Sequence, residues 1–174
     1  MDIKKIIREF DSFLGERNQT FEAVIIGGAA LNLLSIASRV TRDVDVLDPT
    51  VLPDLILKYA RDFAQKASLP KDWLNNGPAD VLKYLPKGWE TRTREVFNGS
   101  CLKLRTLGET ELLMTKCWAY CDRERDYDDI IAMKPSTSQI EEITRWLKTL
   151  DGNPDWPAFV EERMQELFSK TEGE

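Results

Sequence analysis

The sequence of 174 residues contains no histidine. This absence excludes Ser-His-Asp and Cys-His nucleophilic catalysis, metal binding by imidazole and acid-base catalysis by histidine. Any catalytic chemistry must therefore use carboxylates, lysine, arginine or hydroxyl groups.

Long apolar runs and secretion signals are missing as well. No stretch approaches the roughly 18 apolar residues of a membrane span, and the opening MDIKKIIREF has no apolar segment with a cleavage pattern. We therefore expect a cytoplasmic protein without a membrane partner. The three cysteines are too few and odd in number for a disulfide framework, and Cys117 and Cys121 are best explained as small buried residues on one helix face.

Charge is spread unevenly along a chain whose formal net charge is −6. Residues 83–125 carry 9 basic and 6 acidic groups, whereas residues 126–174 carry 5 and 12. The basic middle permits a phosphate-bearing ligand, although a solvated mixture of charges is the simpler explanation.

Hydrophobic spacing predicts an α/β protein with a small mixed sheet flanked by helices and a helical C-terminal part. Residues 1–108 should form the α/β core, and residues 109–174 should complete the active-site cleft within one compact unit. We expect strands near 23–26, 42–47, 93–97 and 101–106, and helices near 3–14, 29–34, 53–67, 109–121, 124–133, 138–149 and 155–170.

Local motifs refine these boundaries. Asn98-Gly99 predicts a hairpin with a type I′ turn, and Ser138-x-x-Glu141 predicts a capping box at a helix start. Residues 68–91 hold several prolines and glycines and predict a loop with one short helix around 79–84.

Two aspartates stand out because Asp43 and Asp45 alternate on one predicted strand. Their carboxylates should project from the same face and approach the same Mg²⁺ or Mn²⁺ ion. An isolated Asp-x-Asp is more often a solvated strand edge, and a lone Gly27-Gly28 after a strand is most often a turn.

The combination of these features resembles the DNA polymerase β-like nucleotidyltransferase superfamily. Its signature is an apolar residue, Gly-Gly or Gly-Ser, and then Asp-x-Asp after a gap like the fifteen residues from Gly28 to Asp43. Further motifs are similar to its AbiEii-type branch, which includes the toxins of type IV toxin–antitoxin systems. These motifs are Arg39-x-Thr41-x-Asp43-x-Asp45, Lys116-x-x-Ala119 and Arg123-x-Arg125-Asp126-x-x-Asp129.

The resemblance implies a function and a set of site residues. It implies transfer of a nucleoside monophosphate (NMP) from a nucleoside triphosphate (NTP) to a hydroxyl of RNA such as tRNA, a protein or a small molecule, with an antitoxin as a candidate partner. Asp43 and Asp45 would bind the metal, and Lys116, Asp126 and Asp129 would complete the catalytic set. The NTP would be bound by Gly27, Gly28, Arg39, Thr41, Arg42 and Arg125.

Other interpretations remain open. A third acidic ligand is missing, because Lys103 stands where the superfamily has an aspartate. This departure favours a nucleotide-binding sensor or protein-interaction module with the same fold. Lys116 could instead be a surface lysine, and residues 122–129 a solvated helix with salt bridges. A glycosyltransferase also uses Asp-x-Asp, but only 42 residues precede Asp43, which is too few for a separate nucleotide-binding domain.

Overall fold

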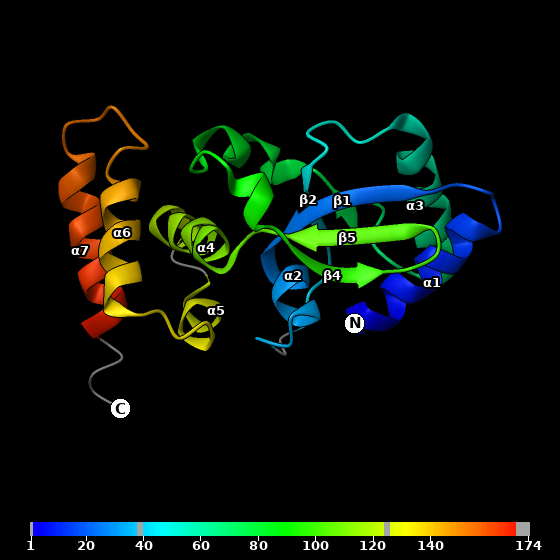
Figure 1. Ribbon diagram of the computed structural model, residues 1–174, viewed down its shortest axis with the longest axis horizontal. Helices are drawn as coiled ribbons and strands as arrows, with labels where there is room; N and C mark the ends of the chain where they lie inside the picture. The colour runs from blue at the N-terminus through cyan, green and yellow to red at the C-terminus, as the bar shows by residue number, and fades with distance from the viewer. Residues whose placement is uncertain (1, 38–39, 124–125, 170–174) are drawn as a thin grey trace. The chain divides into compact units, whose positions relative to one another are not determined.

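A computed structural model describes residues 2–37, 40–123 and 126–169 (Figure 1). Residue contacts divide the chain into two compact units, residues 1–108 and residues 109–174. Each unit has its own buried apolar residues.

The first unit is built on a mixed sheet, as predicted, but its described residues form five strands and not the four expected. Its strands are β1 (Phe21–Ile26), β2 (Val44–Asp48), β3 (Leu74–Asn75), β4 (Arg94–Asn98) and β5 (Leu102–Thr106), in the order β3-β2-β1-β5-β4. β1 pairs with β5 and β2 with β3 in parallel, while the β1–β2 and β4–β5 pairs are antiparallel.

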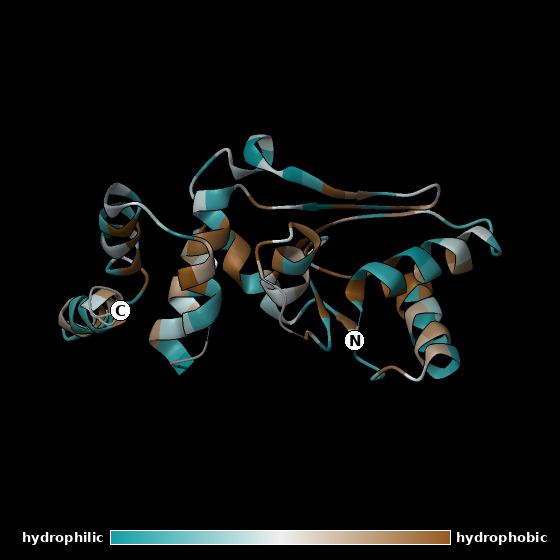
Figure 2. Ribbon diagram, turned by 90° about the horizontal axis from the view of Figure 1, so that it is seen from below, coloured by the Kyte–Doolittle hydropathy of each residue, from teal (hydrophilic) through white to brown (hydrophobic). Residues whose placement is uncertain are grey.

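In the described part of this unit, three helices and two 3₁₀ segments accompany the sheet. The helices are α1 (Ile3–Gly15), α2 (Gly27–Leu33) and α3 (Asp54–Ala67), and the 3₁₀ segments are η1 (Gly77–Tyr84) and η2 (Trp89–Arg92). Figure 2 shows α1 and α3 on the same face of the sheet, with their apolar sides turned inward. An aromatic cluster joins them, because Phe10 of α1 packs 5.3 Å from Phe63 of α3 and 5.1 Å from Trp73. The Trp73 indole also donates a hydrogen bond to the Ala60 carbonyl, which ties the segment before β3 to α3.

The hairpin of β4 and β5 is present, but the predicted type I′ turn is wrong. Three residues separate the strands, and neither Asn98 nor Gly99 has a positive φ. Asp11 of α1 determines the turn instead, since its carboxylate accepts hydrogen bonds from the backbone amides of Ser100, Cys101 and Leu102. A tertiary contact has therefore replaced the local turn preference.

The residues described in the second unit form four helices, α4 (Glu109–Arg123), α5 (Tyr127–Ala132), α6 (Thr137–Leu147) and α7 (Trp156–Ser169). α4 packs against the other three, and α6 packs against α7. The predicted capping box is wrong by two residues, because Ser136 and Gln139 form it in place of Ser138 and Glu141. No helix in the described part of the chain is both long and apolar enough to span a membrane.

Candidate functional site

The glycine turn after β1 and the first half of β2 meet within the first unit. Ile26 lies opposite Asp45 in the β1–β2 pair, so Asp45 stands beside the start of α2. A Cβ atom on Gly27 would lie 2.6 Å from Asp45 Oδ2, and Gly27 has a φ of +77°. Both the backbone conformation and the available space therefore require glycine.

Asp43 lies immediately before β2 and not within the strand, two residues from Asp45. Its side chain is exposed, whereas Thr41 is buried. The Thr41 hydroxyl lies 3.3 Å from Asp43 Oδ1 and 3.2 Å from the Asp43 carbonyl oxygen. The Thr41 hydroxyl therefore contacts both the side chain and the backbone of Asp43.

The remaining predicted NTP ligands of this unit lie nearby in sequence. Gly28 belongs to α2 and has no positive φ, and Arg42 is exposed beside Asp43. Arg39 lies outside the described residues.

Along β2, Asp45 stands between the fully buried Val44 and Val46, so its side chain projects from the other face of the sheet. Buried Leu102 and Leu104 of β5 alternate with exposed Lys103 and Arg105, and Glu22 of β1 lies opposite Lys103. Lys103 forms an ion pair with Glu22 at 3.1 Å, two strands away from β2. Among the described residues, no group of three or more Asp, Glu, Cys or His side chains is arranged to hold a metal. The carboxylates of Asp43 and Asp45 nevertheless supply the hard oxygen ligands that Mg²⁺ prefers.

Asn75 is a residue of this region that the sequence did not indicate. It lies directly opposite Asp45 in the parallel β2–β3 pair, and its Nδ2 donates to Asp45 Oδ1 at 3.2 Å. The two residues are 30 positions apart, and β3 is only two residues long, so no local pattern points to their contact.

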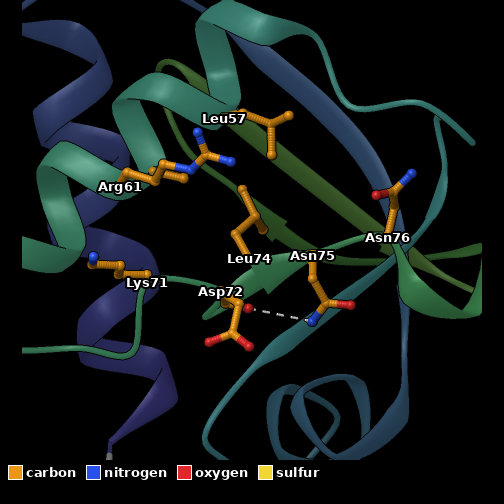
Figure 3. Close-up of a pocket in the computed structure, with 8 residues that line it drawn as sticks. Leu57, Arg61, Lys71, Asp72, Leu74, Asn75 and Asn76 are labelled. Atoms are coloured by element: carbon orange, nitrogen blue, oxygen red, sulfur yellow. Dashed lines mark hydrogen bonds between the residues drawn. The ribbon is translucent and has the colours of Figure 1, made fainter.

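A pocket adjoins Asn75 on the side of α3 (Figure 3). In this view Leu74 points toward Leu57, whereas Asn75 points away from it. The pocket is lined by Leu57, Ala60, Arg61, Lys71, Asp72, Leu74, Asn75 and Asn76. Asn75 therefore stands between this pocket and Asp45.

In the second unit, Lys116 of α4 is buried between two aspartates. Its Nζ lies 2.8 Å from Asp126 Oδ1 and 2.6 Å from Asp129 Oδ2. Lys116 is only 4% exposed and Asp129 only 1%, so Lys116 is not a surface lysine and these acids are not a solvated helix face. Asp126 adopts a φ of +75° at the start of α5. The structure thus brings three predicted residues together, while Arg125 lies outside the described residues.

The cysteines of α4 are buried free thiols, as predicted. Burial raises the pKa of Cys121 to about 11 and raises that of Cys117 as well. Both side chains therefore remain neutral at physiological pH and serve as packing residues.

Comparison with known proteins adds one finding. A family model described as a nucleotidyltransferase of unknown function (DUF6036) matches residues 2–141. This description names a nucleotidyltransferase family and does not identify the AbiEii-type branch. No curated protein and no solved structure was found to match the chain.

Proposed function

Since the chain belongs to a family of nucleotidyltransferases of unknown function (DUF6036), we propose that it transfers NMP from an NTP to a hydroxyl group with the help of Mg²⁺. The arrangement that carries this proposal places the Asp45 carboxylate so near Gly27 that a Cβ atom there would lie 2.6 Å from Asp45 Oδ2. It joins a carboxylate that suits a divalent cation to a backbone turn without side chains, which suits phosphate oxygens.

In this proposal Asp43 and Asp45 hold the metal ion, and Mn²⁺ can take its place. A bound divalent cation would neutralise negative charge on the triphosphate and on the departing pyrophosphate. Gly27 and Gly28 contact the triphosphate through their backbone, and Thr41 fixes the Asp43 carboxylate. The Arg42 side chain, exposed next to Asp43, supplies positive charge to the same ligand.

The reaction exchanges one bond to phosphorus for another. The acceptor hydroxyl oxygen bonds to the α-phosphorus, the bond from that phosphorus to the β-bridging oxygen breaks, and pyrophosphate leaves with the electron pair. The hydroxyl proton passes to a base or to solvent. On the motif resemblance we also propose Lys116, Asp126 and Asp129 as members of the catalytic set, with Arg125 as a further cation; within the second unit the two carboxylates hold the Lys116 ammonium.

The acceptor and the biological partner are proposed on the motif resemblance alone. RNA such as tRNA, a protein or a small molecule offers a hydroxyl, and the AbiEii-like motifs favour a toxin-like role with an antitoxin partner. These motifs include Arg39-x-Thr41-x-Asp43 and Lys116-x-x-Ala119.

A second candidate is a nucleotide sensor that binds NTP without transferring NMP. It is favoured by the lack of a third acidic ligand near Asp43 and Asp45 among the described residues. Pyrophosphate release separates the two functions, because only a transferase produces it.

The test combines two measurements on the same protein. NTP binding is followed by calorimetry, and pyrophosphate release is followed in the presence of Mg²⁺, total RNA and soluble extract. We expect wild type to bind and to release pyrophosphate, and Asp43→Asn and Asp45→Asn to lose release. Binding without release in wild type would favour the sensor, and absence of both would overturn the proposal.

A further inference from the structure

Asn75 makes two sets of contacts that concern different parts of the first unit. Its Oδ1 accepts a hydrogen bond from the Gly77 backbone amide at 2.9 Å, which begins η1. Its Nδ2 donates to Asp45 Oδ1 at 3.2 Å and lies 3.5 Å from the Asp72 carbonyl oxygen. The amide is therefore engaged at both ends.

The orientation of this amide follows from its neighbours. The Gly77 N–H needs an acceptor, so the carboxamide oxygen faces Gly77 and the NH₂ group faces the Asp45 carboxylate. An aspartate could replace the first contact, because a carboxylate also accepts from an amide. It could not replace the second, because a carboxylate has no hydrogen to donate.

The Asp45 carboxylate is consequently held from two sides. Oδ1 receives the Asn75 hydrogen bond, and Oδ2 is directed at the Gly27 turn. Asn75 lies opposite Asp45 on the adjacent strand, so the contact is built into the sheet. Rotation of the carboxylate away from Gly27 would break this bond.

We infer that Asn75 is a positioning residue that fixes the Asp45 carboxylate for metal binding. This inference rests on the proposed function, since it assumes that Asp45 is a metal ligand. Hydrogen-bonding partners of metal ligands typically contribute about 10- to 100-fold to metal affinity. Asn75 thus supplies orientation without supplying a third negative charge.

The alternative is that Asn75 only starts η1, and two substitutions distinguish these roles. Asn75→Ala removes both contacts. Asn75→Asp keeps an acceptor for Gly77 but places a second carboxylate against Asp45. Asn76→Asp is the control for Mn²⁺ affinity, since it adds the same charge one residue further along; it also loses a hydrogen bond to the Thr50 carbonyl, so only its affinity is compared.

The experiment measures binding of Mn²⁺ alone by electron paramagnetic resonance and thermal stability with and without the ion. We expect Asn75→Ala to weaken Mn²⁺ binding by about tenfold. Asn75→Asp should be less stable than wild type without metal, because the two carboxylates repel each other, and should gain more stability than wild type on adding Mn²⁺. Asn76→Asp should retain wild-type affinity.

Two results would overturn the inference, and they differ in meaning. If Asp45→Asn abolishes Mn²⁺ binding while Asn75→Ala and Asn75→Asp bind as wild type, Asn75 only builds the loop and the proposed function stands. If Asp45→Asn binds Mn²⁺ as wild type does, Asp45 is not a metal ligand, and the proposed metal site fails together with the role of Asn75.

Discussion

At Gly27, the backbone conformation and the space available for a side chain both require glycine. A φ of +77° is strained for any other residue, and a Cβ would meet Asp45 Oδ2 at 2.6 Å. The sequence could predict a glycine turn here, because Gly27-Gly28 follows an apolar strand. It could not predict which atom of which residue the turn approaches.

We expect Gly27→Ala to abolish NMP transfer and to destabilise the protein by about 1–3 kcal/mol, the range for a strained non-glycine residue. The loss follows because the new methyl group must displace the Asp45 carboxylate. Gly152→Ala is the control, since apart from its chain neighbours no described residue lies within 4 Å of its Cβ position. Chemical denaturation measures the stability of both variants, and the transfer assay measures their activity. An active Gly27→Ala protein would contradict the role of this turn.

Lys116 illustrates how burial changes the interpretation of a charged residue. Leu112, Leu113 and Ala119, about one helical turn from Lys116, are apolar, which is equally consistent with a surface lysine and a buried one. The decisive feature is the approach of Asp126 and Asp129 from α5 and the residue before it, at 2.8 and 2.6 Å. That approach depends on how α4 and α5 pack.

Lys116→Met should destabilise the second unit by about 3–5 kcal/mol, because it leaves two carboxylates together without their cation. Lys148→Met is the matched control, since Lys148 pairs with Glu161 at a more exposed position, and we expect it to change stability little. Thermal unfolding followed by circular dichroism compares the two. Equal effects of both substitutions would contradict a special contribution from the buried group.

At the scale of elements, segments with a regular apolar spacing could be predicted from the sequence. Elements whose form depends on contacts between distant residues could not. The apolar spacing of residues 3–14 predicts α1 to within one residue, because burial of one helix face alone determines it. β3 escaped prediction since two residues carry no period, and its place depends on pairing with β2. The prediction of a type I′ turn was wrong because the carboxylate of Asp11, almost 90 residues away, accepts hydrogen bonds from the backbone amides of the turn.

Asp11→Ala tests that explanation of the hairpin. We expect a loss of about 2 kcal/mol in unfolding free energy, since the turn loses charge-assisted hydrogen bonds to three backbone amides. Ser12→Ala is the neighbouring control, because the Ser12 hydroxyl donates to the Arg8 carbonyl within the same helix. Hydrogen exchange at Cys101 and Leu102 should accelerate in Asp11→Ala alone; unchanged exchange would refute the role of Asp11.

The cysteines of α4 give a test of packing in the second unit. Burial raises the pKa of Cys121 from 9.0 to about 11, so at pH 8 its thiolate fraction falls about 100-fold. Iodoacetamide should therefore modify the half-exposed Cys101 well before Cys117 or Cys121, and raising the pH toward 11 should speed the reaction of Cys121. Mass spectrometry identifies the modified residue, and rapid labelling of Cys121 at pH 8 would contradict its burial.

For the whole molecule, the family match crosses the boundary between the two units. It begins at residue 2 and ends at residue 141, within α6, so it includes the glycine turn, Asp45 and the Lys116 ion group. The family pattern therefore includes predicted site residues of both units. The acidic α7 follows the matched region.

The most direct test of the central claim is transfer of label from each α-³²P-labelled NTP to an acceptor in total RNA and soluble extract with Mg²⁺. We expect label on RNA, protein or a small molecule with wild type and none with Asp43→Asn or Asp45→Asn, while Gly152→Ala remains active. Transfer that persists at the wild-type level in both aspartate variants, or no transfer by wild type from any NTP, would contradict the assignment of Asp43 and Asp45 as the metal site of a nucleotidyltransferase.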